Sequence, residues 1–181
     1  MWLAGDEASL YLQASLMRVF APLGETPVVK AHPGRENTHF YGALNLTMGE
    51  EVVLRSDLMT AEVSALFLQQ VLRAYPLRPR AYPLRPIVLL WDRAPWHQGE
   101  AIRSVLFANP RLEIVRLPPA CPELNPQEQV WKAVREAVSH NHTYTNLSDL
   151  AQAFETYLRE TRFACSLLDK HDYHNLCTRF I

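Results

Sequence analysis

The sequence predicts an α/β fold: a mixed β-sheet whose first three strands are antiparallel, followed by parallel strands, with helices on both faces. Three observations predict it. The first sixty residues read as short strands joined by turns, which favours antiparallel pairing. From Thr60 onward, helical segments alternate with short apolar strands, and such alternation adds parallel strands to a sheet. The unbroken apolar run at 87–91 is typical of a central strand covered on both faces.

Each element has a local signal. Strands are expected at 2–6, 39–46 and 51–55, and a further hairpin at 18–21 and 27–30. Thr60 is a suitable N-cap for a helix that continues to the Tyr75-Pro76 break. A second helix is expected around 101–106, ending at Asn109-Pro110, and a further strand at 112–117.

Two more helices follow. Asn125 is expected to open the first, with these residues on its buried side: Val130, Val134, Ala137 and Val138. The second starts at about Asn146 and carries an apolar stripe formed by Leu147, Leu150, Ala151, Phe154, Tyr157 and Leu158. We expect one domain over residues 1–160 and a C-terminal tail over 161–181.

Composition limits the function classes. The 181 residues are 48% hydrophobic and 20% charged, as in ordinary globular domains, and the net charge of −1 argues against a free-standing nucleic-acid binder. The apolar run at 87–91 is too short to cross a bilayer, and the N-terminus lacks the basic start of a signal peptide. Three widely spaced cysteines favour a reducing, cytoplasmic location.

One segment is strongly basic. No acid occurs between Glu62 and Asp92, and four arginines fall there: Arg73, Arg78, Arg80 and Arg85. Residues 73–79 (Arg-Ala-Tyr-Pro-Leu-Arg-Pro) are repeated identically at 80–86. Two interpretations stay open. The favoured one is a tandem duplication that lengthens a helix-to-strand loop, and the other is a loop that tracks a DNA backbone with arginine and tyrosine.

Three acids are candidates for a metal site: Asp6, Asp92 and Glu128. Asp6 and Asp92 are expected to end strands at the edge where open α/β sheets place their ligand sites, and Glu128 falls in the first turn of the helix opened by Asn125. Converging carboxylates need a compensating cation, and Mg²⁺ or Mn²⁺ prefers such oxygen ligands. Two ions ~4 Å apart would activate a water or hydroxyl and stabilise the leaving oxygen of a phosphodiester.

Each acid also has a purely structural interpretation, which is favoured when the acids are considered singly. Asp6 and Asp92 would each begin a turn. Residues 125–128 (Asn-Pro-Gln-Glu) are similar to a capping box with Glu128 as its acid. When the three acids are considered together with the segments that flank them, the metal site is favoured over these structural roles.

Two of those segments carry a family resemblance. Residues 89–97 (Leu-Leu-Trp-Asp-Arg-Ala-Pro-Trp-His) and 117–131 (Leu-Pro-Pro-Ala-Cys-Pro-Glu-Leu-Asn-Pro-Gln-Glu-Gln-Val-Trp) resemble the DDE transposases of the mariner superfamily, in its bacterial insertion-sequence branch. The 35 residues between Asp92 and Glu128 are close to the family's spacing. Gly5-Asp6-Glu7 matches its first strand, and residues 20–27 match its next hairpin, so the resemblance spans about 2–140.

The resemblance implies a ribonuclease-H-like fold and a DNA strand-cleaving and strand-transferring enzyme that acts on transposon ends and target DNA. It implies that Asp6 and Asp92 share one metal ion and that Glu128 completes the site of a second. Glu7 and Glu123 are not expected to be ligands. It further implies a homodimer on DNA. The family's helix-turn-helix domain is missing before the first strand, so we expect it to be encoded separately.

Some residues depart from the family pattern. Arg93 replaces the usual Asn, which puts a cation beside the metal site, and Cys121 replaces the usual Ser. The alternative is therefore an inactive transposase remnant that keeps the fold and binds DNA or a partner. His97 matches a family position, and an ordinary structural hydrogen bond is favoured over a proton-carrying role.

Further positions have weaker signals. Lys132 and Arg135 follow Glu128 on the same helix and are expected to be solvated or to contact DNA. Arg93, beside the metal site, is expected to bind a DNA phosphate or to hinder metal loading. Trp131 is expected in the core. The tail residues Cys165, His171, His174 and Cys177 offer zinc-ligand types, but their spacing matches no common zinc pattern and we expect no site there.

Overall fold

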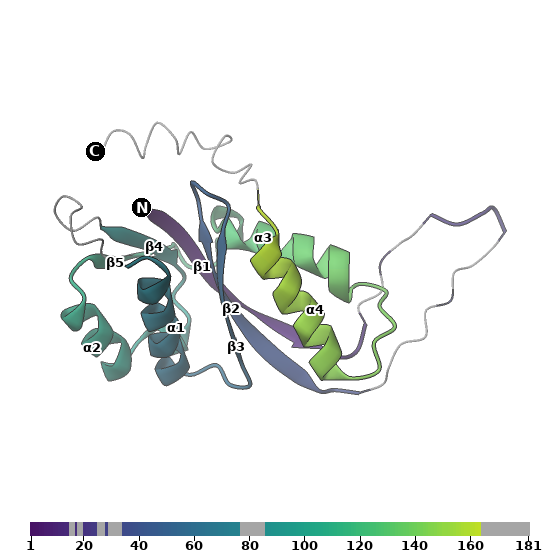
Figure 1. The fold of residues 1–181 in the computed structure, drawn as a ribbon, viewed down its shortest axis with the longest axis horizontal. Coiled ribbons are helices and arrows are strands. Elements are labelled where there is room, and N and C mark those ends of the chain that lie inside the picture. The colour runs from purple at the N-terminus through teal and green to yellow at the C-terminus, as the bar shows by residue number, and fades with distance from the viewer. Residues whose placement is uncertain (15–16, 18–19, 25–27, 29–33, 77–85, 164–181) are drawn as a thin grey trace.

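A five-stranded mixed sheet forms the centre of the protein (Figure 1). The structure is a computed structural model, and it describes residues 1–14, 17, 20–24, 28, 34–76 and 86–163. The strands are β1 (Trp2–Tyr11), β2 (Asn37–Asn45), β3 (Glu51–Ser56), β4 (Ile87–Trp91) and β5 (Leu112–Arg116). They lie in the order β3-β2-β1-β4-β5, so β1 is the central strand although it comes first in the chain.

The pairing matches the expected mixed sheet. β1 pairs antiparallel with β2, and β2 with β3, while β4 pairs parallel with both β1 and β5. The contact between β1 and β4 is short and includes Ala4 opposite Leu90. The apolar strand β4 is therefore buried between two parallel neighbours, as its composition predicts.

Helices cover both faces of the sheet. α1 (Ala61–Ala74) and α2 (Glu100–Ala108) lie on one face, and α3 (Gln127–Val134) and α4 (Leu147–Glu160) on the other (Figure 1). The predicted caps are confirmed, because Thr60 Oγ1 accepts from the Val63 N–H and the Asn146 side chain accepts from the Asp149 N–H. Within the described residues, none of the helices combines the length and the hydropathy that a bilayer crossing requires.

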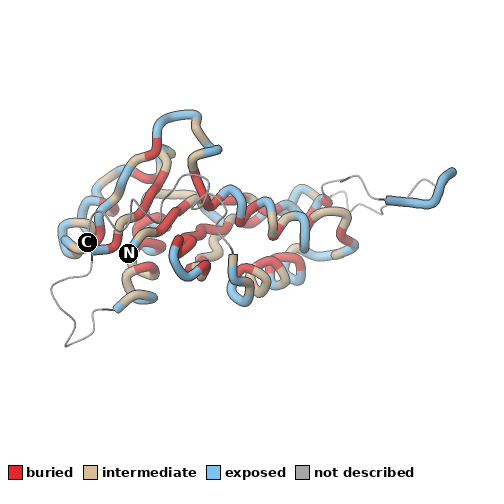
Figure 2. Tube along the Cα trace, turned by 90° about the horizontal axis from the view of Figure 1, so that it is seen from above, coloured by how far each residue is buried: buried red, intermediate tan, exposed pale blue. Residues whose placement is uncertain are grey.

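Each face of the sheet has its own hydrophobic core. On one face α1 and α2 pack against Leu89 and Trp91, and on the other α3 and α4 pack against Phe40 and Leu90. The buried residues run along the strands and the inner sides of the helices, with exposed residues outside them (Figure 2). Alternating strand residues thus serve two cores, which is the reason for the three-layer arrangement.

The first sixty residues differ from the sequence prediction in two respects. β1 continues to Tyr11, so Asp6 lies in the interior of the strand and not at its end. β1 stays a strand beyond Ala4 because β2 remains hydrogen-bonded to it, with Asp6 opposite Gly42, after β4 has ended its pairing. The predicted hairpin is not formed by residues 20–24 and 28, and residues 18, 19, 27, 29 and 30 lie outside the described residues.

The helix after Asn125 also differs in its second half. α3 begins at Gln127 and is continued by a π-helical segment, Arg135–Ser139. Val130 and Val134 are buried as predicted, but Ala137 is exposed and Ser139 is buried. A π turn has more residues than an α turn, so it rotates the following side chains away from the face that a 3.6-residue period predicts.

Candidate active site

Strands β1 and β4 and helix α3 bring the three predicted acids to one cavity. β1 and β4 are parallel with Ala4 opposite Leu90, so two residues later Asp6 on β1 comes level with Asp92, the first residue after β4. Glu128 lies in the first turn of α3. The three acids line a cavity of about 330 Å³ together with Arg93, Ala94, Asn125 and residues 117–122. Glu7 and Glu123, which are not expected to be ligands, are not among its lining residues.

The start of α3 is fixed to the sheet by two buried side chains. The Asn125 amide donates to the Gly5 carbonyl at 3.1 Å, and its Oδ1 accepts from the Gln127 N–H at 3.2 Å. Gln127 accepts from the Leu44 N–H at 3.0 Å and donates to Glu51 Oε1 at 2.6 Å. These contacts place the exposed Glu128 beside β1. Residues 125–128 therefore anchor the helix to the sheet, in addition to the helix-capping role that the structural interpretation gave them.

Asp6 is held from the α3 side of the sheet. The indole Nε1–H of Trp131 donates to Asp6 Oδ2 at 3.1 Å. Burial, followed by the negative charges of Glu7, Glu128 and Asp92, raises the pKa of Asp6 to about 7, although a hydrogen bond from the Glu7 backbone opposes the rise. Trp131 is buried as predicted. Its hydrogen bond to Asp6, a candidate metal ligand, was not predicted from the sequence.

Asp92 is held from the other side. Its Oδ1 accepts from the Ala94 N–H at 3.0 Å and lies 2.7 Å from His97 Nδ1. The hydrogen bond from His97 lowers the pKa of Asp92, despite its partial burial. His97 is fully buried at the end of a short 3-10 helix, η1 (Pro95–His97), and its Nε2 lies 2.9 Å from both carboxylate oxygens of Glu7.

Two arginines flank the same turn. Arg93 is exposed and lines the cavity, and its Nε donates to the Leu117 carbonyl at 3.1 Å. Arg116 donates to the carbonyls of Asp92 and His97 at 2.8 and 2.5 Å. The turn that carries Asp92 is therefore held by side chains from two directions.

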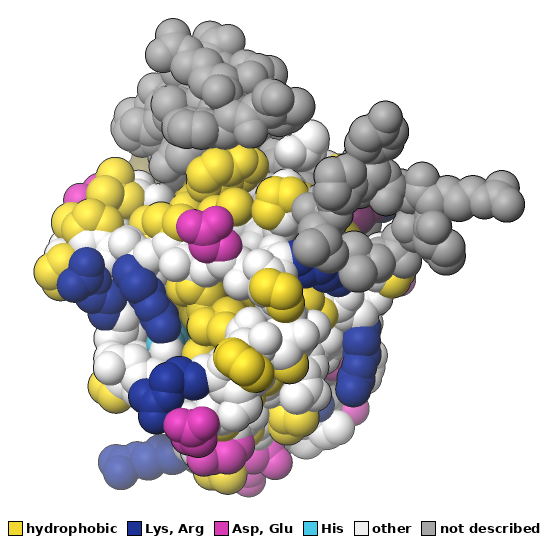
Figure 3. Space-filling model, turned by 90° about the vertical axis from the view of Figure 1, so that its left-hand side faces the viewer, with side chains coloured by type: hydrophobic (Ala, Val, Ile, Leu, Met, Phe, Trp, Pro, Cys, Tyr) yellow, Lys and Arg dark blue, Asp and Glu magenta, His cyan; other side chains and the backbone are white. Residues whose placement is uncertain are grey.

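Three other predicted DNA-contacting residues that the structure describes do not line the cavity. Arg73 is exposed in the last turn of α1, and Lys132 is exposed on α3 with its Nζ 4.0 Å from Glu136. Arg135 is half-buried in the π-helical segment. Arg78, Arg80 and Arg85 lie outside the described residues, as do Cys165, His171, His174 and Cys177. Figure 3 shows the side where α1 and α2 lie, with basic side chains bordering a strip of apolar ones.

The donor chemistry of the cavity fits a hard divalent cation, but its carboxylates do not form a ready-made chelate. In the part of the chain that the structure describes, no three His, Cys, Asp or Glu side chains are arranged to hold a metal ion. The donors are carboxylate oxygens. The pKa of Asp6 is raised first by burial and then by the neighbouring acids, and a bound cation would offset the repulsion among these acids. Glu128 is exposed, whereas Asp6 and Asp92 are half-buried.

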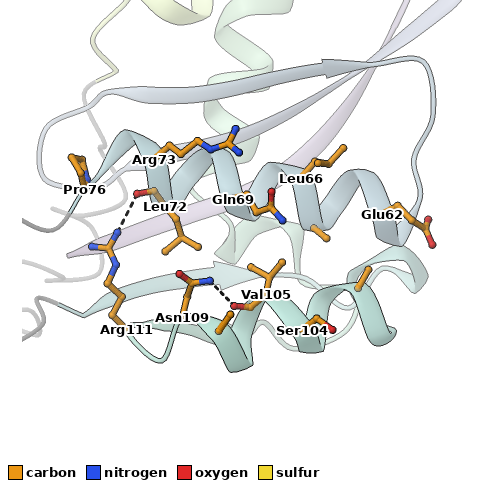
Figure 4. Close-up of a pocket in the computed structure, with 13 residues that line it drawn as sticks. Glu62, Leu66, Gln69, Leu72, Arg73, Pro76, Ser104, Val105, Asn109 and Arg111 are labelled. Atoms are coloured by element: carbon orange, nitrogen blue, oxygen red, sulfur yellow. Dashed lines mark hydrogen bonds between the residues drawn. The ribbon is translucent and has the colours of Figure 1, made fainter.

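A larger cavity, of about 930 Å³, lies between α1 and α2 (Figure 4). Its lining includes Leu66, Leu72 and Val105, with Glu62 as its one acid among the described residues. Arg111 closes one end by donating to the carbonyls of Leu72 and Tyr75. It offers no cluster of carboxylates, so the candidate chemistry belongs to the smaller cavity.

Four residues of the site were missed by sequence reasoning: Glu7, Arg116, Asn125 and Gln127. For Glu7 one signal was present in the sequence. Alternation along a strand puts Asp6 and Glu7 on opposite faces of the sheet, so Glu7 could be expected to point into the interior on the face opposite Asp6. For Arg116 and Gln127 the partners are backbone carbonyls or residues far away in the chain, and no local pattern indicates them. Asn125 was noticed as a cap only.

Comparisons with known proteins identify the family of this chain. A family model described as DDE superfamily endonuclease matches residues 2–151. The insertion element IS630 uncharacterized 39 kDa protein of Shigella sonnei is 22% identical over 153 residues, which is 84% of this chain and 43% of that protein. The uncharacterized protein y4pE/y4sA of Sinorhizobium fredii is 33% identical over 63 residues, 35% of this chain and 44% of that protein.

Solved structures show the same fold. The Mos1 transposase paired-end complex with left transposon end matches with a TM-score of 0.65 and 14% identity, over 90% of this chain and 49% of that one. The catalytic domain of Mos1 mariner transposase matches with a TM-score of 0.59 and 13% identity, over 88% and 70%. The predicted ribonuclease-H-like fold is confirmed, and this chain spans less than half the length of the two relatives matched by sequence. With a family match over residues 2–151 and the three acids on one cavity, the chain belongs to the DDE superfamily endonucleases.

Proposed function

We propose that this chain is a transposase catalytic domain that cuts DNA strands at transposon ends and transfers them to target DNA. One observation carries the proposal: Asp6, Asp92 and Glu128, from three separate elements, line one cavity in a member of the DDE superfamily endonucleases. The likeness to Mos1 transposase complexes with DNA supports the substrate. The reaction would take place in the bacterial cytoplasm, where the DNA lies.

We assign the three acids as the ligands of two divalent ions, Mg²⁺ or Mn²⁺. When bound, such ions activate a water or hydroxyl and stabilise the leaving oxygen of a phosphodiester. Asp6 would bind a cation in its deprotonated form, Trp131 and His97 hold the two aspartates, and the exposed Glu128 would complete the ligand set. Matched structures include Mos1 paired-end complexes with Mn and with Mg, which supports the choice of ions.

The partners in this proposal are DNA, a second copy of the chain and a separately encoded helix-turn-helix domain. Arg93 lies on the cavity wall, where a scissile phosphate would sit, and Arg73, Lys132 and Arg135 would contact the DNA further away. Arg78, Arg80 and Arg85 of the repeated segment would add phosphate contacts. The family resemblance supports the homodimer and the extra domain.

Metal binding is the first test. Mn²⁺ should raise the melting temperature of the wild type and not that of Asp92→Asn, because a ligand that binds only the native state stabilises it, by about 2.7 kcal/mol at 100 times its Kd. Glu123→Gln is the matched control, since Glu123 is an exposed acid near the site that does not line the cavity. Equal shifts in wild type and Asp92→Asn would reject the site.

Strand cleavage is the second test. Purified chain, with the helix-turn-helix domain supplied, should nick a plasmid that carries the element's terminal repeats, and Glu128→Gln should not. The location of Arg93 in the cavity favours a second candidate, a remnant that keeps the fold but does not cleave. Metal binding without nicking by the wild type, together with nicking by Arg93→Asn, would support that candidate.

A further inference from the structure

We infer that Glu7 and His97 form a positioning device for Asp92, in which β1 fixes both aspartates of the site. The inference rests on the proposed function, in which Asp92 is a metal ligand. β1 presents Asp6 to the cavity directly, and the next residue, Glu7, points to the opposite face of the sheet. There it binds His97, and His97 binds Asp92. Two adjacent residues of β1 thus serve the two aspartates: Asp6 is itself one of them, and Glu7 positions Asp92 through His97.

The imidazole of His97 is held on its edges and on its face. Nδ1 lies 2.7 Å from Asp92 Oδ1, and Nε2 lies 2.9 Å from both oxygens of Glu7. Its ring stacks on Trp91 with a centroid distance of 3.6 Å. A ring fixed in this way cannot turn without losing both carboxylates, so it defines where Asp92 Oδ1 sits.

Asp92 consequently has one occupied and one open oxygen. The Ala94 N–H and His97 Nδ1 both use Oδ1, and within the described residues no hydrogen bond is formed to Oδ2. Asp92 lines the cavity, and its side chain is 47% exposed. The carboxylate is thus pinned by its inner oxygen and offers the outer one to the cavity.

Among the described residues, the Glu7 side chain forms hydrogen bonds only with the two rings of η1. Its side chain is 4% exposed, and a buried carboxylate is costly unless it is paired. Its side-chain partners are the two rings of η1, because Trp96 Nε1 also donates to Glu7 Oε2 at 3.0 Å. We therefore infer that the buried Glu7 serves to fix the position of η1 through Trp96 and His97.

His97 is a positioning residue and does not touch the reacting atoms. It is fully buried, it does not line the cavity, and both ring nitrogens are occupied by carboxylates. The backbone of the turn has a separate support in Arg116, which donates to the carbonyls of Asp92 and His97. Substitutions at His97 should therefore affect the Asp92 carboxylate more than the path of the chain.

Two substitutions separate the two halves of the device. In His97→Asn the amide nitrogen corresponds to Nδ1 and keeps a donor for Asp92, whereas in His97→Gln it corresponds to Nε2 and keeps a donor for Glu7. Both lose the stacked ring, so their metal-free melting temperatures should fall by similar amounts. The Mn²⁺ affinity, measured by the EPR signal of free Mn²⁺, should fall about 10–100-fold in His97→Gln and less than about threefold in His97→Asn.

A metal-free measurement tests the contacts themselves. In protein with ¹⁵N-labelled histidine, NMR should show the Nδ1–H of His97 protected from exchange with solvent in the wild type. Glu7→Leu should reduce that protection if Glu7 anchors the ring. This readout requires no substitution at His97, so it decides the matter if the His97 variants do not fold.

The outcomes are distinct. An unprotected Nδ1–H in the wild type overturns the inference, whatever the metal result. A protected Nδ1–H with equal Mn²⁺ affinity in His97→Gln, His97→Asn and wild type overturns the inference and leaves the proposed function standing. If the wild type binds no Mn²⁺, the proposed function fails, and protection that depends on Glu7 still supports the positioning of Asp92.

Discussion

The indole N–H of Trp131 donates to Asp6 Oδ2 at 3.1 Å and so joins helix α3 to the interior of the central strand β1. The two residues are 125 positions apart in the chain. The bond makes Trp131 both a core residue and a support for a candidate ligand. It also explains how α3 can place Glu128 on the same cavity as Asp6.

This bond predicts energetic coupling. Hydrogen bonds to charged groups contribute about 1.5–3 kcal/mol, so a double-mutant cycle with Trp131→Phe and Asp6→Ala should give a coupling free energy of about that size in urea unfolding at pH 8. The single change Trp131→Phe should also lose part of a buried ring. Additive effects of the two substitutions would show that the contact contributes nothing to stability.

Gly42 is predicted to tolerate no side chain. It lies opposite Asp6 on β2, and a Cβ there would overlap Glu51 Oε1 and would lie 2.5 Å from Gln127 Nε2 and 2.7 Å from the Trp131 ring. Gly42→Ala should lower the free energy of unfolding by about 1–3 kcal/mol or more, because overpacked cores are strained. Gly5→Ala is the control with a smaller expected loss, since its nearest contact is the Leu89 side chain at 3.0 Å. Equal losses in both would contradict the tight packing around Gly42.

Glu51 should make stability depend on pH. Burial raises its pKa well above the ordinary value of 4.5, although the hydrogen bond from Gln127 opposes this. The folded state therefore holds a proton that the unfolded state releases, and stability falls as the pH rises above 4.5, by up to about 1.4 kcal/mol per pH unit.

Glu51→Gln should remove the part of that fall that Glu51 contributes, because a glutamine keeps the acceptor for Gln127 without the charge. The part that comes from Asp6, whose pKa is also raised, should remain. Urea unfolding at several pH values should show the variant more stable than the wild type at pH 8, with no such advantage at pH 4. Glu113→Gln, at an exposed position of β5, serves as the control. A wild-type stability independent of pH over this range would count against a buried, protonated Glu51.

Metal binding should depend on the proton of Asp6. Its pKa is raised to about 7, so at lower pH the bound proton competes with the ion. The apparent Mn²⁺ affinity should rise by about tenfold per pH unit below pH 7 and level off above it. Titrations between pH 5.5 and 8.5 would show this, and a flat profile would exclude Asp6 as the competing group.

Arg93 should contribute one phosphate contact. Arg93→Gln is expected to weaken binding to duplex DNA and to lower the slope of log K against log salt by about 1, because one fewer counterion is released. Arg103→Gln is the control, since Arg103 is exposed on α2 and pairs with Glu100. Fluorescence anisotropy at several salt concentrations measures both, and an unchanged slope would remove Arg93 from the interface.

Much of the fold could be predicted from sequence because its signals are local. Thr60 and Asn146 cap their helices within three residues, and the apolar run of β4 needs no partner to be recognised. The extent of β1 could not be predicted this way. Whether the chain stays extended after Asp6 depends on backbone bonds to β2, more than thirty residues later.

The site divides in the same manner. By itself the sequence determined the three acids, the order of the elements that carry them and the family, because these are properties of short segments and their spacing. Only the tertiary structure decided that Asp6 lies within a strand, that Glu7 holds His97, and that Gln127 and Trp131 tie α3 to the sheet. Those contacts join side chains 76 to 125 residues apart, and periodicity shows which face a residue occupies but not which distant residue it meets there.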